Sequence, residues 1–203
     1  MELYKSSRTL SKDDYKLLLN EGKGKERILE FGPGYSTYAW IEAGAKLIIS
    51  LECHRPWREE KKEQFKRYPQ VHVARFDNIA PVAEVADICH THGPYDLALV
   101  DSPRGMASRE RLEGQEECSR LNTCLAALEH APVVLLHDAV RPCERNTLNW
   151  LAQLGHTIKF LAEPPEWGTH NYSYGLARIT RNGKDERRPD LPGVEMLGSA
   201  TAG

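Results

Sequence analysis

Two apolar runs in the second half of the chain end in acidic residues. The run "LALVDSPRG" reaches Asp101, and "VLLHDAVRPCE" reaches His137 and Asp138. Carboxylates and an imidazole can take a proton from a hydroxyl group or bind a divalent metal ion. Because neighbouring strand residues point to opposite faces, His137 and Asp138 can serve one site only if the strand ends or kinks between them. We rank Asp101 and Asp138 first as catalytic or metal-binding candidates, and His137 next.

A glycine-rich turn near the start of the chain offers backbone groups to a ligand. In "RILEFGPGYSTYAW" an apolar run leads through Gly32 and Gly34 into a segment of helical length that begins near Tyr35. Glycines let a ligand approach the backbone, and a helix N-terminus has unpaired N–H groups. The dinucleotide fingerprint requires a third glycine where this chain has Thr37. A pyrophosphate ligand is therefore disfavoured.

These residues need a framework of strands and helices to position them. Strands are predicted from apolar runs at 27–31, 46–52, 71–76, 95–101, 132–138, 156–162 and 172–179. Helices are predicted at 11–20, 35–43, 56–67, 81–92 and 107–129. Strands rich in Val, Ile and Leu that alternate with helices are typical of a parallel sheet built from βαβ units. We predict an α/β fold in one domain, 1–182, followed by a flexible polar tail at 183–203.

The glycine turn, together with the acid that ends the next apolar run, resembles the cofactor site of class I methyltransferases, which bind S-adenosylmethionine. An acid precedes the two glycines, and the following strand ends at Glu52. The resemblance implies a Rossmann-like, mostly parallel seven-stranded sheet in the order 3-2-1-4-5-7-6, with the last strand antiparallel and helices on both faces. It also implies that Glu52 binds both ribose hydroxyls, since a carboxylate can accept two hydrogen bonds from a diol.

The same resemblance assigns the other cofactor contacts. Glu30 is expected to support the turn, and the residues expected to line the cofactor are Gly32, Gly34, Tyr35, Ser36 and Asp101. The segment "RFDN" after the third strand places Asp77 or Asn78 where the family often contacts the adenine amino group. Asp-Asn is also ordinary loop sequence, so both interpretations of this pair stay open.

Four longer blocks sharpen the resemblance. "FGPGYSTYAW", "SLECHRPW", "LVDSPRG" and "LLHDAVRPCE" occur in the same order as blocks of the glucuronoxylan 4-O-methyltransferase-like family, and the similarity spans residues 27–154. That family methylates the 4-hydroxyl group of glucuronic acid side chains on xylan, and a divalent metal is implicated there. Catechol-type methyltransferases bind magnesium through an acid after the fourth strand and Asp-Asn after the fifth, whereas Ala139 takes the Asn position here. A divalent metal at Asp101 and Asp138 is thus an open hypothesis.

The acceptor implied by this resemblance is a sugar, a uronate or another small polar molecule with a hydroxyl group. Arg104 and Arg141 could grip an anionic acceptor, because a guanidinium matches the geometry of a carboxylate. Ion pairs with Glu144 or a neighbouring acid fit the sequence equally well. A long aromatic link between late strands adds residues that could stack on a sugar ring or simply pack: Trp167, His170 and Tyr172.

Composition narrows the partners and the compartment. Lys and Arg number 27 against 29 Asp and Glu, and the signs are mixed along the chain, which disfavours a dedicated nucleic-acid binder. No apolar run is long enough to span a membrane, and the start "MELYKSSRTL" lacks the apolar core of a signal peptide. We expect a cytoplasmic enzyme that acts on a small-molecule or glycan acceptor and could form a homodimer.

Two other functions are compatible with the sequence. One is an NAD(P)-dependent oxidoreductase on a Rossmann sheet, which Thr37 disfavours and which a test of NAD(P) binding would separate. The other is a non-catalytic S-adenosylmethionine-binding module. Such a module would keep Glu30, Gly32 and Glu52 but should tolerate the loss of Asp101 and Asp138.

Overall fold

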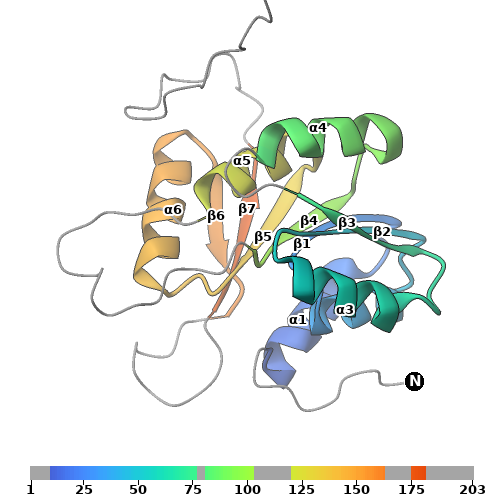
Figure 1. Ribbon diagram of the computed structural model, residues 1–203. Coiled ribbons are helices and arrows are strands. Elements are labelled where there is room, and N and C mark those ends of the chain that lie inside the picture. Colours follow the sequence, from blue (N-terminus) through green and yellow to red (C-terminus); the bar gives the residue numbers. More distant parts are fainter. Residues whose placement is uncertain (1–9, 77–80, 103–119, 163–174, 182–203) are drawn as a thin grey trace, which may run out of the picture.

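A seven-stranded sheet forms the framework of the protein (Figure 1). The computed structural model describes residues 10–76, 81–102, 120–162 and 175–181, without the side chains of 81–84. The strands are β1 (Arg27–Phe31), β2 (Leu47–Glu52), β3 (Val71–Arg75), β4 (Leu97–Val100), β5 (Val133–His137), β6 (Thr157–Phe160) and β7 (Leu176–Thr180). Their order is β3-β2-β1-β4-β5-β7-β6. The first five pair in parallel, and β7 runs antiparallel to β5 and β6, so the predicted class and strand order are confirmed.

The central strands are apolar along their whole length because helices cover both of their faces. Every residue of β4 and β5 is buried, and so are four of the five residues of β1. A parallel sheet enclosed in this way requires apolar side chains at successive positions rather than alternate ones. This burial explains why the strands stand out in the sequence as continuous apolar runs.

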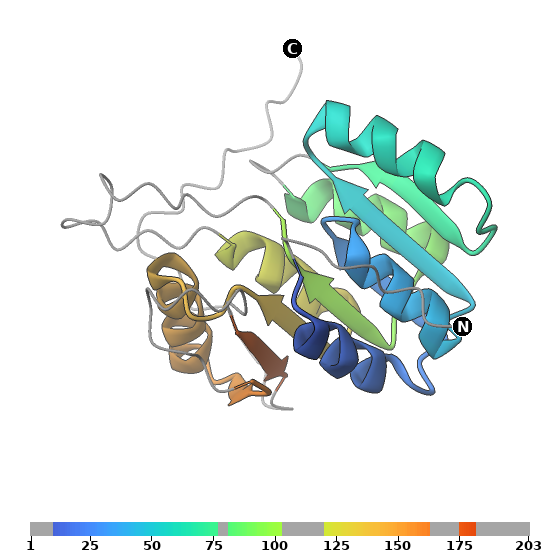
Figure 2. The ribbon, with the colours of Figure 1, turned by 90° about the horizontal axis from the view of Figure 1, so that it is seen from below.

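Three helices pack on each face of the sheet. On one face lie α1 (Lys12–Gly22), α2 (Tyr35–Ala43) and α3 (Arg55–Phe65), and on the other lie α4 (Pro81–His92), α5 (Leu121–His130) and α6 (Pro142–Gln153). Figure 2 shows α1 and α2 side by side across their face, where Leu18 and Trp40 join one buried apolar cluster. Cys124, Leu128 and Leu148 belong to the cluster on the opposite face. Within the described ranges, no helix has the length and apolar character needed to cross a membrane.

The observed helices differ from the predicted ones at two places. The predicted helix at 107–129 appears as α5, which begins at Leu121, and residues 103–119 lie outside the described part of the chain. The helix α6 was not predicted, although Pro142 occupies its first turn, a position where proline favours a helix start. Ser11 caps the N-terminus of α1, since its side chain accepts a hydrogen bond from the Asp14 amide at 3.0 Å.

Candidate active site

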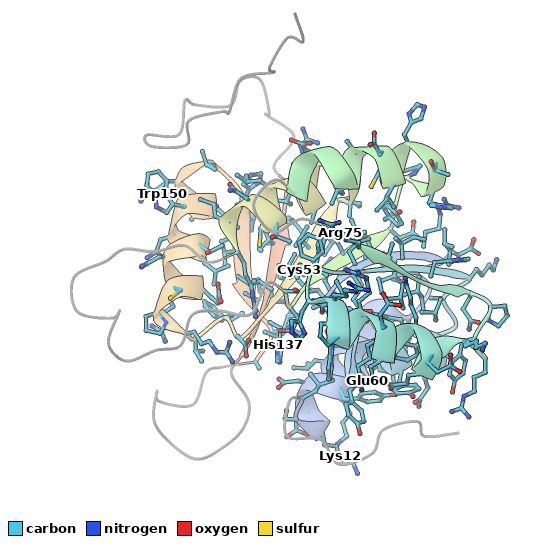
Figure 3. All side chains as sticks on the ribbon, in the orientation of Figure 1. Lys12, Cys53, Glu60, Arg75, His137 and Trp150 are labelled. Carbon is cyan, nitrogen blue, oxygen red and sulfur yellow. The ribbon has the colours of Figure 1, made fainter. Side chains whose placement is uncertain are left out.

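The carboxyl ends of β1, β2, β4 and β5 meet at one edge of the sheet. Phe31 pairs with Leu51 on one side and with Val100 on the other, and Val100 pairs with Leu136. In Figure 3, Cys53 after β2 and His137 at the end of β5 both lie in the central part of the molecule, away from peripheral Trp150. Ligands of open α/β sheets bind beyond such strand ends. This edge therefore collects most of the residues that the sequence singled out.

The two glycines of the turn have different roles. Gly32 has a φ of 97°, and a Cβ there would lie 3.1 Å from the Asp101 carbonyl carbon and 3.1 Å from the Ser102 Cβ. Its amide donates to the Leu51 carbonyl at 2.9 Å, so this glycine locks the turn against the neighbouring strands. A Cβ at Gly34 would meet no described atom within 4 Å. The backbone at Gly34 is therefore open to a ligand, while Gly32 is required by the fold.

Glu30 lies beneath the turn and is saturated by donors of the protein. It is fully buried, and its carboxylate accepts hydrogen bonds from Ser36 at 2.6 Å, Thr37 at 2.7 Å, Ser50 at 2.6 Å and the Trp40 indole at 3.0 Å. Burial raises the pKa of Glu30, and the four hydrogen bonds oppose part of that rise. Glu30 thus ties α2 to β1 and β2 and supports the turn from below.

The side chain of Thr37 explains why the dinucleotide fingerprint is missing. Its hydroxyl donates to Glu30 and accepts the Gly34 amide at 3.1 Å. One of the N–H groups that a pyrophosphate would need is thus already bonded within the turn. Ser36 likewise uses its hydroxyl on Glu30. The hydroxyl groups of Ser36 and Thr37 are thus directed at Glu30. What the turn presents to a ligand is its backbone at Gly34, together with half-buried Tyr35.

Glu52 ends β2 beside the turn. Glu52 is 5% exposed, and one of its carboxylate oxygens accepts a hydrogen bond from the His54 amide at 2.7 Å. Burial raises the pKa of Glu52, and the hydrogen bond from the backbone of His54 opposes that rise. Trp57 in α3 donates its indole N–H to the Pro33 carbonyl at 2.9 Å and so joins the start of α3 to the glycine turn. Glu52 therefore lies at the end of β2, next to the strand that leads into the glycine turn, and its binding to a ribose stays a prediction.

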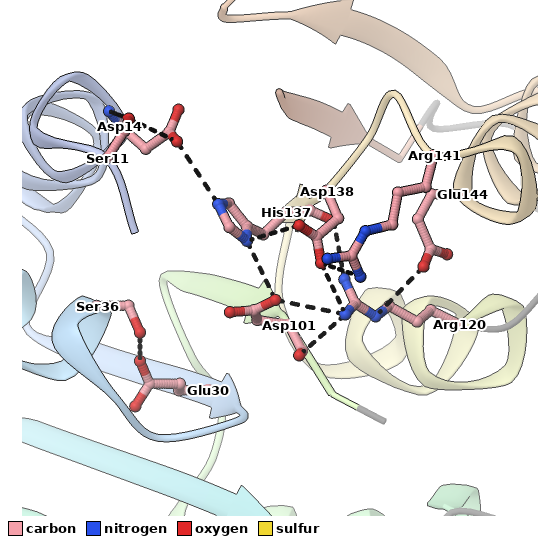
Figure 4. Close-up of polar contacts among 10 residues, drawn as sticks. All are labelled: Ser11, Asp14, Glu30, Ser36, Asp101, Arg120, His137, Asp138, Arg141 and Glu144. Atoms are coloured by element: carbon pink, nitrogen blue, oxygen red, sulfur yellow. Dashed lines mark hydrogen bonds and ion pairs between the residues drawn. The ribbon is translucent and has the colours of Figure 1, made fainter. Parts of the chain in front are cut away.

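The ends of β4 and β5 bring Asp101, His137 and Asp138 together (Figure 4). Strand β5 ends at His137, and Asp138 has a φ of 61°, the left-handed region that few non-glycine residues adopt. This turn lets consecutive residues face the same site, as the sequence argument required. The His137 Nδ1 atom lies 3.1 Å from an Asp101 carboxylate oxygen and 3.6 Å from an Asp138 oxygen. The Asp101 side chain is 30% exposed, whereas that of Asp138 is 5% exposed.

Arg120 is the main site residue that the sequence did not indicate. Its side chain is 2% exposed, and its NH2 atom lies 3.1 Å from an Asp138 oxygen and 3.4 Å from an Asp101 oxygen. Arg120 also donates to the backbone carbonyls of His137 at 2.9 Å and Asp101 at 3.1 Å, and its Nε lies 3.6 Å from Glu144. It stands at the N-terminus of α5 with no recognisable motif around it. No local sequence signal could have identified it.

Arg141 and Asp14 complete the charged cluster. Arg141 pairs with Asp138 at 2.7 Å, which is the neighbouring-acid ion pair that the sequence left open beside acceptor binding. Asp14, fully buried in the first turn of α1, lies 3.7 Å from the Nε2 atom of His137. In the sequence Asp14 is an acid in the first turn of a helix, where acids are common. Its proximity to His137 follows from the packing of α1 against the sheet.

The carboxylates of the cluster control the charge of His137. Burial alone would lower the pKa of His137, but the charges of Asp101 and Asp138 outweigh it and hold that pKa well above its ordinary value. Burial alone would raise the pKa of Asp101, but the charge and hydrogen bond of His137 lower it. Both shifts favour the charged forms, the imidazolium of His137 and the carboxylate of Asp101.

These shifts predict how stability depends on pH. Because the pKa of His137 is raised on folding, its contribution is full below its ordinary value of 6.5 and is lost as the pH rises through the higher folded value. The pKa of Asp101 is lowered, so its contribution is full above its ordinary value of 3.8 and is lost as the pH falls through the lower folded value. Nitrogen-15 NMR of the imidazole at neutral pH should show two N–H groups on His137. A single N–H group would contradict the assignment.

Several predicted site residues lie outside the described part of the chain. They are the adenine candidates Asp77 and Asn78 and the acceptor candidates Arg104, Trp167, His170 and Tyr172. The predicted tail at 183–203 lies outside it as well. The described half of the site consists of the glycine turn, Glu52 and the charged cluster.

Solved structures share this fold. The O-methyltransferase from Bacillus cereus, in complex with SAH, has a TM-score of 0.61 and 15% identity, and the match covers 87% of this chain and 84% of that chain. Cofactor-bound Rv0187 from MTB has a TM-score of 0.60 and 16% identity, with 88% and 83% covered. The precorrin-6y C5,15-methyltransferase from Geobacter metallireducens has a TM-score of 0.55 and 11% identity, with 87% and 92% covered.

Sequence comparison adds no finer assignment. No protein-family model matches the chain, and no curated protein matches it. The likeness to the glucuronoxylan 4-O-methyltransferase-like family thus rests on the four sequence blocks alone. At the level of structure, the strand order and the long matches to these enzymes agree with each other. The chain has the Rossmann-like fold of the class I methyltransferases.

Proposed function

We propose that this protein is an S-adenosylmethionine-dependent O-methyltransferase that acts on a hydroxyl group of a sugar, a uronate or another small polar acceptor. The observation that carries the proposal is the arrangement of three groups at neighbouring strand ends. The open backbone at Gly34 follows β1, the carboxylate of Glu52 ends β2, and the partly exposed carboxylate of Asp101 follows β4. The similar fold of the Bacillus cereus protein, an O-methyltransferase with SAH bound, supports the same chemistry.

The cofactor half of the site fits S-adenosylmethionine. Gly34 offers a backbone that a ligand can approach, and Glu52 offers a carboxylate for a pair of ribose hydroxyls. Glu30 fixes the turn from below and Trp57 fixes it from the side. The bound cofactor would supply a methyl group that its sulfonium already activates. The protein then has to align the acceptor and receive its proton.

Asp101 is the group best placed to receive that proton. Its side chain is 30% exposed, whereas that of Asp138 is 5% exposed and is held by Arg120 and Arg141. His137 is the other candidate base, but its Nδ1 atom lies 3.1 Å from the Asp101 carboxylate and its pKa is raised, which favours a role as a donor that holds Asp101. We therefore assign the base to Asp101 and the support of Asp101 to His137.

Calorimetric titration tests the proposal directly. The purified protein should bind S-adenosylmethionine and S-adenosylhomocysteine with micromolar affinity, and NADH should give no heat. Tight NADH binding would favour the oxidoreductase instead. Absence of binding to both S-adenosylmethionine and S-adenosylhomocysteine would overturn the proposal, and binding would justify a screen of uronates, glycans and simple sugars as acceptors.

Replacing Glu52 with Ala should weaken S-adenosylmethionine binding by about 1.5–3 kcal/mol, the typical worth of hydrogen bonds to a charged group. The matched control is Glu63→Ala in α3, because Glu63 is 77% exposed and pairs with Lys66. That control should bind like the wild type. If Glu52→Ala also binds like the wild type by calorimetry, the ribose assignment is wrong.

The two glycines allow binding and folding to be separated. Gly32→Ala should lower the free energy of unfolding by roughly 1–3 kcal/mol, because it forces a side chain into a left-handed position against Asp101 and Ser102. Gly34→Ala should leave that free energy nearly unchanged and weaken cofactor binding. Urea unfolding and calorimetry on both variants measure the difference. Full binding by a stable Gly34→Ala variant would show that the cofactor does not approach this backbone.

A further inference from the structure

Three side chains at the ends of β4 and β5 have the composition of a metal site. Asp101, His137 and Asp138 each offer a ligand atom, and these atoms lie within 4.8 Å of one another. Two carboxylates and an imidazole are ligands that several divalent metals accept. The resemblance to metal-using methyltransferases makes the same position the natural place for such an ion. Whether an ion fits depends on what these atoms already bind.

Arg120 already uses the carboxylate oxygens that a metal would need. Its NH2 atom lies 3.1 Å from the Oδ2 atom of Asp138 and 3.4 Å from the Oδ1 atom of Asp101. The same guanidinium donates to the backbone carbonyls that follow β4 and end β5. Arg141 adds a second guanidinium, 2.7 Å from the same Asp138 oxygen. A cation that joins both carboxylates is therefore present as part of the chain (Figure 4).

The imidazole of His137 is turned to serve as a donor. Its Nδ1 atom lies 3.1 Å from Asp101, and a carboxylate oxygen can be held there only by an N–H group. Its Nε2 atom lies 3.7 Å from Asp14 on the opposite side of the ring. Metal binding requires a neutral imidazole with a lone pair directed at the ion. Acids on both sides of the ring oppose that state.

Two guanidinium groups already lie beside the acids that would bind the ion. Arg120 and Arg141 both contact Asp138, and Arg120 also lies near Asp101 and Glu144. A divalent ion between Asp101 and Asp138 would lie against two guanidinium groups, and like charges at such distances repel strongly in a buried site. Arg120 cannot simply swing into solvent, because its side chain is 2% exposed and is also held near fully buried Glu144.

We infer that the guanidinium of Arg120 takes the place of a divalent metal ion between Asp101 and Asp138, so that the site holds its acids with a cation of its own. The inference rests on the proposed function, because its consequence for activity is that methyl transfer needs no added metal. The described residues therefore do not fit the divalent metal that the resemblance suggested. Arg120 instead joins the ends of β4 and β5 through both acids and through the carbonyls of Asp101 and His137.

The test compares Mn²⁺ binding to the wild type with Mn²⁺ binding to Arg120→Met. Electron paramagnetic resonance measures the Mn²⁺ that remains free. Methionine replaces the stem of the arginine with an apolar, unbranched chain and removes the guanidinium. The wild type should leave millimolar Mn²⁺ free, and Arg120→Met should bind Mn²⁺ at least roughly tenfold more tightly, with a matching rise in melting temperature. Tight Mn²⁺ binding by the wild type that Asp138→Asn abolishes would overturn the inference.

Two controls make the result specific. Arg141→Met removes the other guanidinium on Asp138 but leaves Arg120 on both acids, so it should not gain Mn²⁺ binding. Arg178→Met breaks a distant pair with Glu21 and should behave like the wild type. A stable Arg120→Met variant with no gain in Mn²⁺ binding would contradict the inference. If that variant folds only when Mn²⁺ is added, as seen by circular dichroism, the inference is supported; if it does not fold at all, the wild-type titration decides.

The outcome is independent of the proposed function. Mn²⁺ binding and melting temperature need neither cofactor nor acceptor, so the inference can fail while S-adenosylmethionine still binds. Conversely, absence of S-adenosylmethionine binding would leave the internal cation in place but remove its link to methyl transfer. Once an acceptor is found, wild-type turnover should be unchanged by EDTA.

Discussion

Asp101→Asn should lower methyl transfer by about 10²–10⁴-fold and leave S-adenosylmethionine affinity nearly unchanged. The amide keeps the size of the side chain but cannot receive a proton, and a positioned acid or base contributes a factor of that size. Asp101 is the member of the cluster with a partly exposed carboxylate, and its hydrogen bond to His137 fixes its direction. Single-turnover rates with a confirmed acceptor, together with calorimetry for the cofactor, measure both quantities.

Two matched variants sharpen this comparison. Asp87→Asn changes an exposed acid of α4 and should be fully active. Asp138→Asn changes a buried acid held by Arg120 and Arg141, so its main effect should be a lower free energy of unfolding, because it takes one charged partner from buried Arg120 and from Arg141. Full activity of Asp101→Asn would show that another group receives the proton. Equal losses of turnover and cofactor affinity would instead make Asp101 a cofactor ligand.

Glu30→Ala should destabilise the protein by about 3–5 kcal/mol, the range for breaking a buried polar network. The variant removes one acceptor and leaves four buried donors, from Ser36, Thr37, Ser50 and Trp40, without a partner. Each unsatisfied buried donor costs energy, and truncation also leaves a cavity. Urea unfolding at neutral pH, with the midpoint and slope compared with the wild type, gives the value.

Glu30→Gln is the control for the same position. The amide oxygen can still accept from the Trp40 indole and the Ser36 hydroxyl, and the amide nitrogen can donate to the other two hydroxyls after these rotate. We expect this variant to lose much less stability than Glu30→Ala. A free energy of unfolding for Glu30→Ala within about 1 kcal/mol of the wild-type value would be an ordinary effect of a single substitution. That result would show that the hydrogen bonds to Glu30 do not stabilise the turn.

Much of the framework could be predicted from the sequence because its signals are local. The strands are continuous apolar runs, since both faces of the central sheet are covered, and Gly32 and Gly34 mark the turn after β1. The strand order came from the resemblance to class I methyltransferases and is confirmed by the pairing. The helix α6 is the exception, because it was not predicted although it lies between two predicted strands and Pro142 is a helix start signal.

The candidate site was predicted only in part, because its charged cluster is assembled by packing. Asp14 and Arg120 are ordinary charged residues in the sequence, one in a first helical turn and one at a helix start. They lie near His137 and Asp138 because α1 packs on one face of the sheet and α5 on the other. Arg141 forms an ion pair with Asp138 at 2.7 Å, which the sequence alone could not show, and its binding to an acceptor stays a prediction.

Apolar runs and glycine turns are formed by adjacent residues, so they indicate in the sequence where strands end and which acids follow them. The surroundings of those acids depend on contacts that form only in the folded chain. Folding brought Arg120 to Asp101 and Asp138 from 19 and 18 positions away along the chain, and it left Asp101 partly exposed while burying Asp138. Burial and charge neutralisation depend on groups that meet in space. For that reason the proposed proton acceptor and the proposed internal cation could be inferred only from the folded chain.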